Sequence, residues 1–136
     1  MATISAGRLT LDVLKSRNGK LYLLVTQPVK GKSPRRCCWF AGDWMAIKSA
    51  MPQVQVLLPS EKEESVTVKV NKSREITICV QKRCLIVRVE CTKKDLATKF
   101  TTWMTEADWK ALVEKQEAID AALAENDEAK PVSLKR

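Results

Sequence analysis

The stretch Trp39-Phe40-Ala41-Gly42-Asp43-Trp44 decides the fold, because the chain echoes it as Trp103-Met104-Thr105-Glu106-Ala107-Asp108-Trp109. A strand-like segment lies upstream of each copy, at 20–25 (KLYLLV) and at 84–89 (CLIVRV). Matched positions are about 64–65 residues apart, a period that indicates an internal repeat. The sequence therefore predicts an α+β fold with two antiparallel β-sheet repeats, each ending in an α-helix.

The repeat sets the expected organisation of the 136 residues. Residues 1–58 would form the first strand-rich repeat with a short helix. Residues 65–126 would form the second, with a long C-terminal helix. Residues 59–64 read as a polar, acidic linker and residues 127–136 as a flexible tail. A chain of this length fits either one ordinary domain or two small halves that share a core.

Local patterns predict the strands of the first half. Alternating apolar residues favour a strand over 9–13, and an Asn18-Gly19 hairpin turn leads to its partner over 21–25. A basic loop is expected over 28–34 and a short strand over 35–40.

Proline and capping signals predict the helices. The first helix is expected from Gly42 to Met51, because Pro52 cannot continue it, and a strand is expected over 53–57. The second half is expected to contain strands over 66–70, 76–80, 85–91 and 99–104, with a charged loop over 92–95. Thr105 then resembles the N-cap of one long amphipathic helix.

The net charge of +8 is distributed unevenly along the chain. Residues 1–58 hold nine basic and two acidic side chains, and residues 59–104 hold ten and six. Residues 105–136 hold five basic and eight acidic side chains, so the basic charge belongs to the strand-rich part. Such an excess favours polyanionic partners, nucleic acid above all, over a charge that serves solubility alone.

The inventory of reactive side chains argues against an enzyme. The chain has no histidine, phosphate-binding glycine loop or nucleophile elbow. Its five cysteines lack metal-ligand spacing, so reduced structural thiols are expected, with no metal and no cofactor. A metal-dependent nuclease using Asp12, Asp43 or Glu75 remains a formal alternative.

The same sequence predicts where the chain resides. No apolar run approaches the ~20 residues of a membrane span, so no membrane partner is expected. The N-terminus does not resemble a signal peptide, and the protein is expected to be cytoplasmic or nuclear and not secreted.

Outward-facing strand and hairpin residues are the candidate contacts. The predicted nucleic-acid-binding residues are Arg8, Lys20, Tyr22, Lys30, Lys32, Arg35, Arg36, Trp39, Lys69 and Arg88. Cations would follow the phosphates while aromatic rings stack on bases. The hairpin cations equally fit solvated side chains that keep sheet edges apart, and Tyr22 equally fits a packed strand residue. Trp44 and Trp109 are expected in the core, whereas Trp39 and Trp103 fit either core or stacking.

The junction Met104-Thr105-Glu106-Ala107-Asp108-Trp109-Lys110-Ala111-Leu112 resembles the single-stranded DNA-binding domain of the transcriptional positive cofactor four family. The similarity covers roughly residues 75–125. It implies a curved antiparallel sheet followed by one helix, with paired subunits whose sheets carry the nucleic acid. Two copies in one chain would form a pseudo-dimer, an arrangement that is similar to Pur-alpha repeats and to Whirly proteins.

The sequence thus favours a non-enzymatic protein that binds single-stranded DNA or RNA with little sequence preference. The alternative is a protein-interaction or assembly module. Its C-terminal helix, with an acidic face and an apolar stripe, would pair with the same helix of another chain to form a homo-oligomer.

Overall fold

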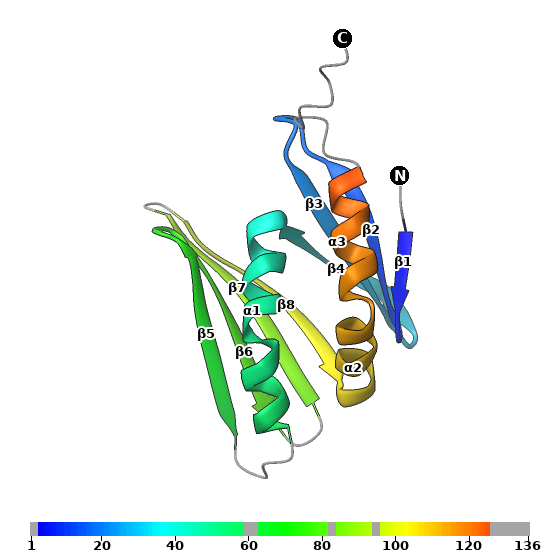
Figure 1. Cartoon of the computed structure of the whole chain (residues 1–136), viewed down its shortest axis with the longest axis vertical. Coiled ribbons are helices and arrows are strands. Elements are labelled where there is room, and N and C mark those ends of the chain that lie inside the picture. Colours follow the sequence, from blue (N-terminus) through cyan, green and yellow to red (C-terminus); the bar gives the residue numbers. More distant parts are fainter. Residues whose placement is uncertain (1–2, 59–62, 82–83, 94–95, 126–136) are drawn as a thin grey trace.

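The computed structural model describes residues 3–58, 63–81, 84–93 and 96–125, with backbone alone at residue 84 and over 88–100. Within these residues the fold is α+β, with two four-stranded antiparallel sheets (Figure 1). The first sheet contains β1 (Thr3–Ala6), β2 (Leu9–Lys15), β3 (Leu21–Val29) and β4 (Lys32–Phe40), in that order. The second contains β5 (Glu64–Asn71), β6 (Arg74–Gln81), β7 (Cys84–Lys93) and β8 (Leu96–Thr105), in that order. The helices are α1 (Ala41–Leu57), α2 (Glu106–Glu114) and α3 (Gln116–Glu125).

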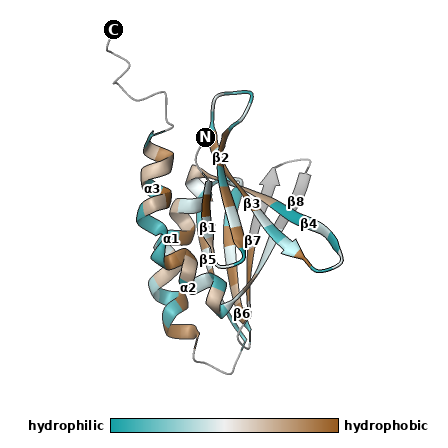
Figure 2. Ribbon diagram, turned by 90° about the vertical axis from the view of Figure 1, so that its right-hand side faces the viewer, coloured by the Kyte–Doolittle hydropathy of each residue, from teal (hydrophilic) through white to brown (hydrophobic). Residues whose placement is uncertain are grey.

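The helices form one layer on one side of the sheets (Figure 2). Helix α1 follows the first sheet in the chain but packs against β5 and β6 of the second sheet. Helix α2 follows the second sheet and contacts β1 of the first sheet as well as β8. The edge strands β4 and β8 also contact each other. The helices therefore join the two sheets, and neither half is packed on its own.

The core lies between the helix layer and the sheet faces that point toward it. The alternation of apolar residues explains this placement, because every second strand side chain points to the same face. Its largest fully buried side chains are Trp39, Trp44, Trp109, Leu9, Leu11, Leu23, Ile47, Ile76, Ile78, Leu85, Met104 and Leu112. Trp44 and Trp109 are thus the core anchors that the sequence predicts. Buried side chains of both halves belong to one cluster.

The first helix continues through Pro52, so its predicted end at Met51 is wrong. The residues expected to form a strand over 53–57 are the last turn and a half of α1. Proline removes one backbone donor and typically costs about 3 kcal/mol in a helix interior. Ala50, Met51 and Val54 are buried on both sides of the proline, and burying these side chains offsets that cost.

The last helix is not long, which corrects a second prediction. It divides into α2 and α3 at Lys115, whose φ of −95° and ψ of 5° leave the α-helical region. The Lys115 N–H donates to carbonyls of the preceding turn, and Ile119 and Ala122 on α3 still reach the core. The break thus redirects the chain without losing burial of the apolar stripe.

The predicted basic loop over 28–34 is also wrong. Strand β3 extends to Val29 and β4 begins at Lys32, so only Lys30 and Gly31 form the turn. The register between β3 and β4 shifts between Gln27 and Val29. Pro28 lies at this irregularity, where its missing N–H interrupts no regular pair.

One further strand is not predicted by the sequence, and one strand ends later than predicted. Strand β1 precedes the first predicted strand, and β7 continues to Lys93 where a charged loop was expected. The predicted linker overlaps β5 at Glu64, and its residues 59–62 lie outside the described residues, as does the predicted tail.

Two local predictions are confirmed. Gly19 adopts a φ of +79° in the turn between β2 and β3, where its N–H donates to the Ser16 carbonyl at 2.9 Å. Thr105 caps α2 because its Oγ1 accepts the N–H of Asp108 at 3.1 Å. The repeat relation between the two halves stays a prediction.

Candidate nucleic-acid interface

Each sheet has a second face that points away from the helices, here called its outer face. The outer face of the first sheet carries the half-buried or exposed residues Thr10, Asp12, Leu14, Tyr22, Leu24, Thr26, Arg36, Cys38 and Phe40. The outer face of the second sheet carries Ser65, Thr67, Lys69, Glu75, Thr77, Cys79, Gln81, Ile86, Thr101 and Trp103. Strand register fixes both sets, since paired residues share a face.

The hairpins of the first sheet form a segment without acidic residues. Residues 13–42 contain seven lysines and arginines and no aspartate or glutamate. Six of these cations are exposed, namely Arg17, Lys20, Lys30, Lys32, Arg35 and Arg36. A run of cations on one continuous antiparallel unit raises the local positive potential. This group of six is called the hairpin cations below.

The β3–β4 hairpin carries four of the hairpin cations. Figure 2 shows this hairpin projecting away from the helix layer. Arg36 pairs with Thr26 and therefore belongs to the outer face, whereas the adjacent Arg35 points to the opposite face. The two adjacent arginines therefore extend to opposite sides of the hairpin.

Aromatic rings occupy both outer faces. Tyr22 and Phe40 pair across β3 and β4 with ring centroids 5.6 Å apart. Trp103 on β8 is 39% exposed and pairs with Ile86. Trp39, which is among the predicted binding residues although its position also fits the core, is fully buried and cannot offer its ring to a base. Its indole Nε1 lacks a hydrogen-bond partner in the described part of the chain.

Arg8, another predicted contact, lies in the turn between β1 and β2 and binds Asp108. Its Nε and Nη2 lie 3.2 and 2.9 Å from Asp108 Oδ2, and its backbone N–H donates to Oδ1 at 3.0 Å. Burial acts to raise the pKa of Asp108, but hydrogen bonds from Arg8 and from the Thr105 N–H, together with the charge of Arg8, outweigh burial and lower it. Gly7 permits this approach, since a Cβ there would lie 2.6 Å from Asp108 Oδ1. Arg8 is therefore committed to a structural ion pair.

Arg74 makes an equivalent pair with Asp43, the third residue of α1. Its Nε and Nη2 donate to the two carboxylate oxygens, each at 2.6 Å. The Asp43 side chain is 0% exposed and that of Arg74 is 15% exposed. The Phe40 N–H donates to Asp43 Oδ2 at 2.8 Å, so the carboxylate also holds the start of the helix. Arg74 further lies over the Phe40 ring, 5.2 Å from its centroid.

The two predicted contacts on the second sheet, Lys69 and Arg88, have less support from the structure than the hairpin cations. Lys69 is exposed on the outer face of β5, but it pairs directly with Glu75 on β6. Arg88 pairs with Thr77 and Thr101 through its backbone, and its side chain is outside what the structure describes. The hairpin cations therefore lie in the first sheet, whose outer face also carries one carboxylate, Asp12.

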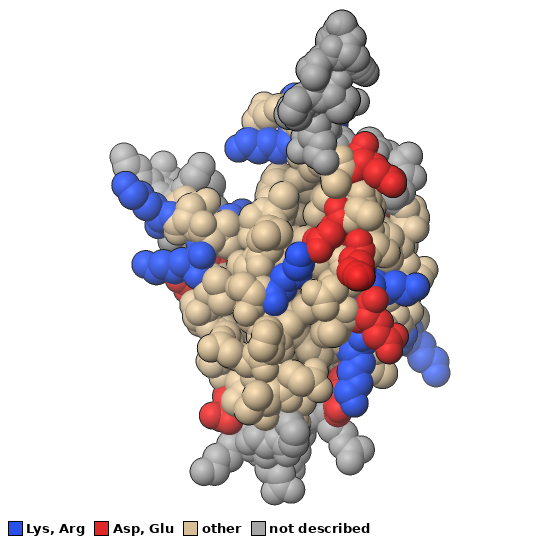
Figure 3. All heavy atoms as spheres, viewed as in Figure 1, with Lys and Arg blue, Asp and Glu red and all other residues tan. Residues whose placement is uncertain are grey.

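The helix layer carries acidic side chains. Figure 3 shows Asp and Glu gathered over α2 and α3. Asp120 on α3 accepts the Trp44 Nε1–H at 2.8 Å and binds Lys48 Nζ at 2.6 Å. Burial acts to raise the pKa of Asp120, but hydrogen bonds from Lys48 and Trp44, with the Lys48 charge, lower it. The charges are therefore segregated, with cations on the hairpins and anions on the helices.

Two of the carboxylates that a metal-dependent nuclease would use, Asp12 and Asp43, bind different partners. Asp43 is paired with Arg74, and Asp12 on β2 accepts a hydrogen bond from Thr3 Oγ1. Among the described residues, no group of three His, Cys, Asp or Glu side chains is arranged to hold a metal ion. Cys37 and Cys38 are free thiols whose pKa burial raises.

Sequence reasoning missed three contributors to this surface. Arg17 is not among the predicted contacts, although it belongs to the same acid-free run. Phe40 is predicted only as the end of a strand, and Trp103 is predicted to fit either the core or base stacking. Successive strand residues point to opposite faces of the sheet. Counting the residues between each aromatic ring and the N-cap of the helix that follows would therefore have predicted which face the ring occupies.

Models of protein families, curated proteins and solved structures were each searched, and none matched the chain. No helix in the described ranges has both the length and the apolar character needed to cross a bilayer.

Proposed function

We propose that this chain binds single-stranded nucleic acid, DNA or RNA, through the outer sheet faces and the hairpins of the first sheet. The observation that carries the proposal is the acid-free segment 13–42, which holds six exposed cations, whereas acidic side chains gather over α2 and α3. A polyanion is attracted to the hairpins and repelled by α2 and α3, so this charge segregation orients it.

Binding on this surface is mainly electrostatic and has little sequence preference. The hairpin cations neutralise phosphates and release counterions, which makes affinity fall with salt. Tyr22, Phe40 and Trp103 add stacking, which tolerates any base because every base presents a flat π-face. A single strand can expose its bases to these rings, whereas a duplex keeps them stacked inside. A duplex reader would more often present an exposed recognition helix, and here the α2–α3 layer is acidic.

The two halves are further proposed to be copies of one unit that form a pseudo-dimer. The two arginine–aspartate pairs support this relation. Arg8 follows the first strand of its sheet and binds the third residue of α2, and Arg74 begins the second strand of its sheet and binds the third residue of α1. Each pair thus links one sheet to the helix that follows the other sheet.

The assembly alternative has less support. It needs an apolar stripe on the last helix that is free for another chain. Trp109, Leu112 and Ile119 on that stripe are 0% exposed within this chain, so they have no free area to offer. Its exposed acidic residues would repel the same residues of a second copy.

The proposal is tested by reversing charge at matched positions. Arg35→Glu with Arg36→Glu removes two hairpin cations, whereas Lys110→Glu with Lys115→Glu makes the same charge change on the helix layer. Fluorescence anisotropy of a labelled single strand is measured over a range of salt. The hairpin variant should bind more weakly and reduce the salt slope by about 1–2, since each single-strand phosphate contact contributes about 0.7. Equal losses in both variants would mean that only net charge matters, and the proposed surface would be wrong.

A further inference from the structure

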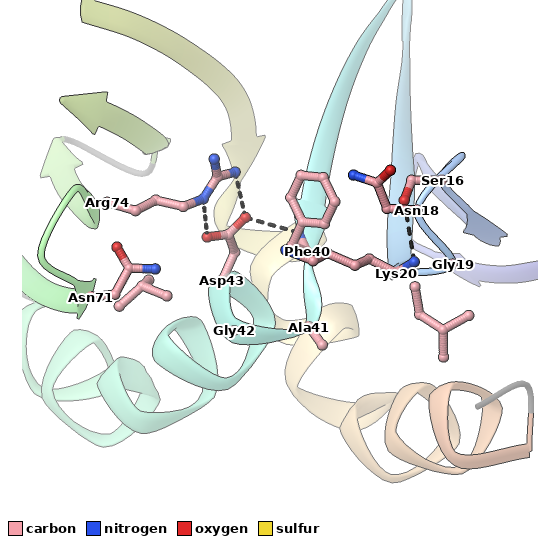
Figure 4. A pocket seen from close by; sticks show the side chains of 12 residues that line it. Ser16, Asn18, Gly19, Lys20, Phe40, Ala41, Gly42, Asp43, Asn71 and Arg74 are labelled. Atoms are coloured by element: carbon pink, nitrogen blue, oxygen red, sulfur yellow. Dashed lines mark hydrogen bonds and ion pairs between the residues drawn. The ribbon is translucent and has the colours of Figure 1, made fainter. Parts of the chain in front are cut away.

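A pocket of about 640 Å³ lies where the first sheet, α1 and the second sheet meet. The turn between β2 and β3 forms one wall with Asn18 and Lys20, and the turn between β5 and β6 forms the other with Asn71 and Arg74. Figure 4 shows the Phe40 ring standing between these walls. Pockets that bind small molecules usually measure about 300–1,000 Å³, so the space suits one nucleotide.

The pocket is continuous with the proposed binding surface. Phe40 lines it and also pairs with Tyr22, whose ring centroid is 5.6 Å away on the outer face. Lys20 lines it and is one of the hairpin cations. A strand that follows the outer face of the first sheet therefore reaches the mouth of the pocket.

The pocket lining matches a nucleotide in three respects. Phe40 offers an aromatic surface, and the guanidinium of Arg74 lies 5.2 Å from its ring centroid. Proteins hold unstacked bases against such rings and guanidinium planes. The side-chain amides of Asn18 and Asn71 carry donors and acceptors of the kind that pair with base edges. Lys20 supplies a positive charge for the phosphate.

The walls are held in place by the fold. Arg74 is fixed by its two hydrogen bonds to buried Asp43, and Asn71 Oδ1 accepts the Ser73 N–H at 2.9 Å. On the opposite wall, the Gly19 N–H donates to the Ser16 carbonyl at 2.9 Å and so holds the turn that carries Lys20. A prearranged site loses less free energy in ordering its side chains when a ligand binds.

From this geometry we infer that the pocket receives one unstacked nucleotide of the bound strand, with its base against Phe40 and its phosphate at Lys20. The inference rests on the proposed single-strand binding and adds to it a site that recognises a base. It makes affinity depend on the presence of a base, beyond the charge of the backbone.

The test compares two labelled strands of equal length, oligothymidylate and an abasic deoxyribose-phosphate strand. Wild-type protein should prefer oligothymidylate. Phe40→Leu and Asn18→Ala should each lower that preference, with the loss of one stacked base reducing it about 5- to 100-fold for Phe40→Leu. Asn18 is exposed in a turn, so its variant should retain the fold even where Phe40→Leu is destabilised. Lys115→Gln, on the helix layer, serves as the control and should leave the preference unchanged.

The outcomes separate the two proposals. If wild type binds both strands and neither pocket variant changes their ratio, the pocket inference is wrong while single-strand binding holds. If wild type binds neither strand at low salt, the proposed function itself is wrong. A reduced ratio in both pocket variants, with a normal ratio in the control, supports the inference.

Discussion

The two arginine–aspartate pairs should contribute unequally to stability. Arg74→Met removes the partner of Asp43 and leaves a carboxylate that is 0% exposed. Breaking a buried pair from one side costs about 3–5 kcal/mol, because the remaining charge stays buried without compensation. At roughly 3–5 °C per kcal/mol for a chain of this size, the melting temperature should fall by more than about 10 °C.

Arg8→Met is the matched variant. The Arg8 side chain is 52% exposed, and Asp108 keeps the N–H groups of Arg8 and Thr105 at 3.0 and 3.1 Å. We expect a loss of about 1–2 kcal/mol, at the low end of the usual cost of about 1–3 kcal/mol for a buried group that loses its partner, because these two hydrogen bonds remain. Urea unfolding followed by tryptophan fluorescence measures both variants, since Trp44 and Trp109 are buried.

A third variant isolates the charge effect. Asp43→Asn combined with Arg74→Met removes the uncompensated carboxylate and should recover part of the stability lost in Arg74→Met alone. The reasoning fails if Arg74→Met costs less than about 1 kcal/mol, or no more than Arg8→Met. Either result would mean that these pairs do not hold the helices to the opposite sheets.

Three further predictions concern the helix layer, the outer face and acid stability. Pro52→Ala should stabilise the protein by up to about 3 kcal/mol in urea unfolding, because it restores a donor inside α1, and unchanged stability would argue against a helix through this position. Trp103→Ala should weaken single-strand binding by about 1–3 kcal/mol, measured by anisotropy, with little change in melting temperature, and unaltered affinity would remove this ring from the surface. Asp108 and Asp120 have lowered pKa values, so their stabilisation is complete above the ordinary aspartate pKa of about 3.9 and is lost as pH falls through the lower folded values. Melting temperatures across this range should fall less steeply in Asp120→Asn than in wild type, and parallel curves would contradict the assignment.

Local chemistry predicts much of the fold. The Asn18-Gly19 turn, the alternating strands and the Thr105 cap depend on neighbouring residues, and each is observed. Pro52 and Lys115 show where such reasoning fails. A proline inside a helix is tolerated because distant strands cover the residues around it, and the break at Lys115 has no glycine or proline to announce it.

The sequence predicts which part of the chain carries the positive charge of the candidate site, but not which aromatic rings are exposed there. Trp39 lies one residue before the N-cap Phe40 and Trp103 lies two before the N-cap Thr105. A shift of one residue moves a strand side chain to the other face, so Trp39 is buried and Trp103 is exposed. Arg8 and Asp108 form an ion pair although they are 100 residues apart in the sequence, and no local sequence pattern predicts such a contact.

The central claim is that the hairpins and outer faces bind single strands of nucleic acid. The most direct measurement is a salt titration of affinity for single-stranded DNA, single-stranded RNA and duplex DNA of matched length. We predict tighter binding to single strands than to the duplex at each salt concentration, with affinity that falls steeply as salt rises. A flat salt dependence, or no binding to either single strand at low salt, would contradict the account.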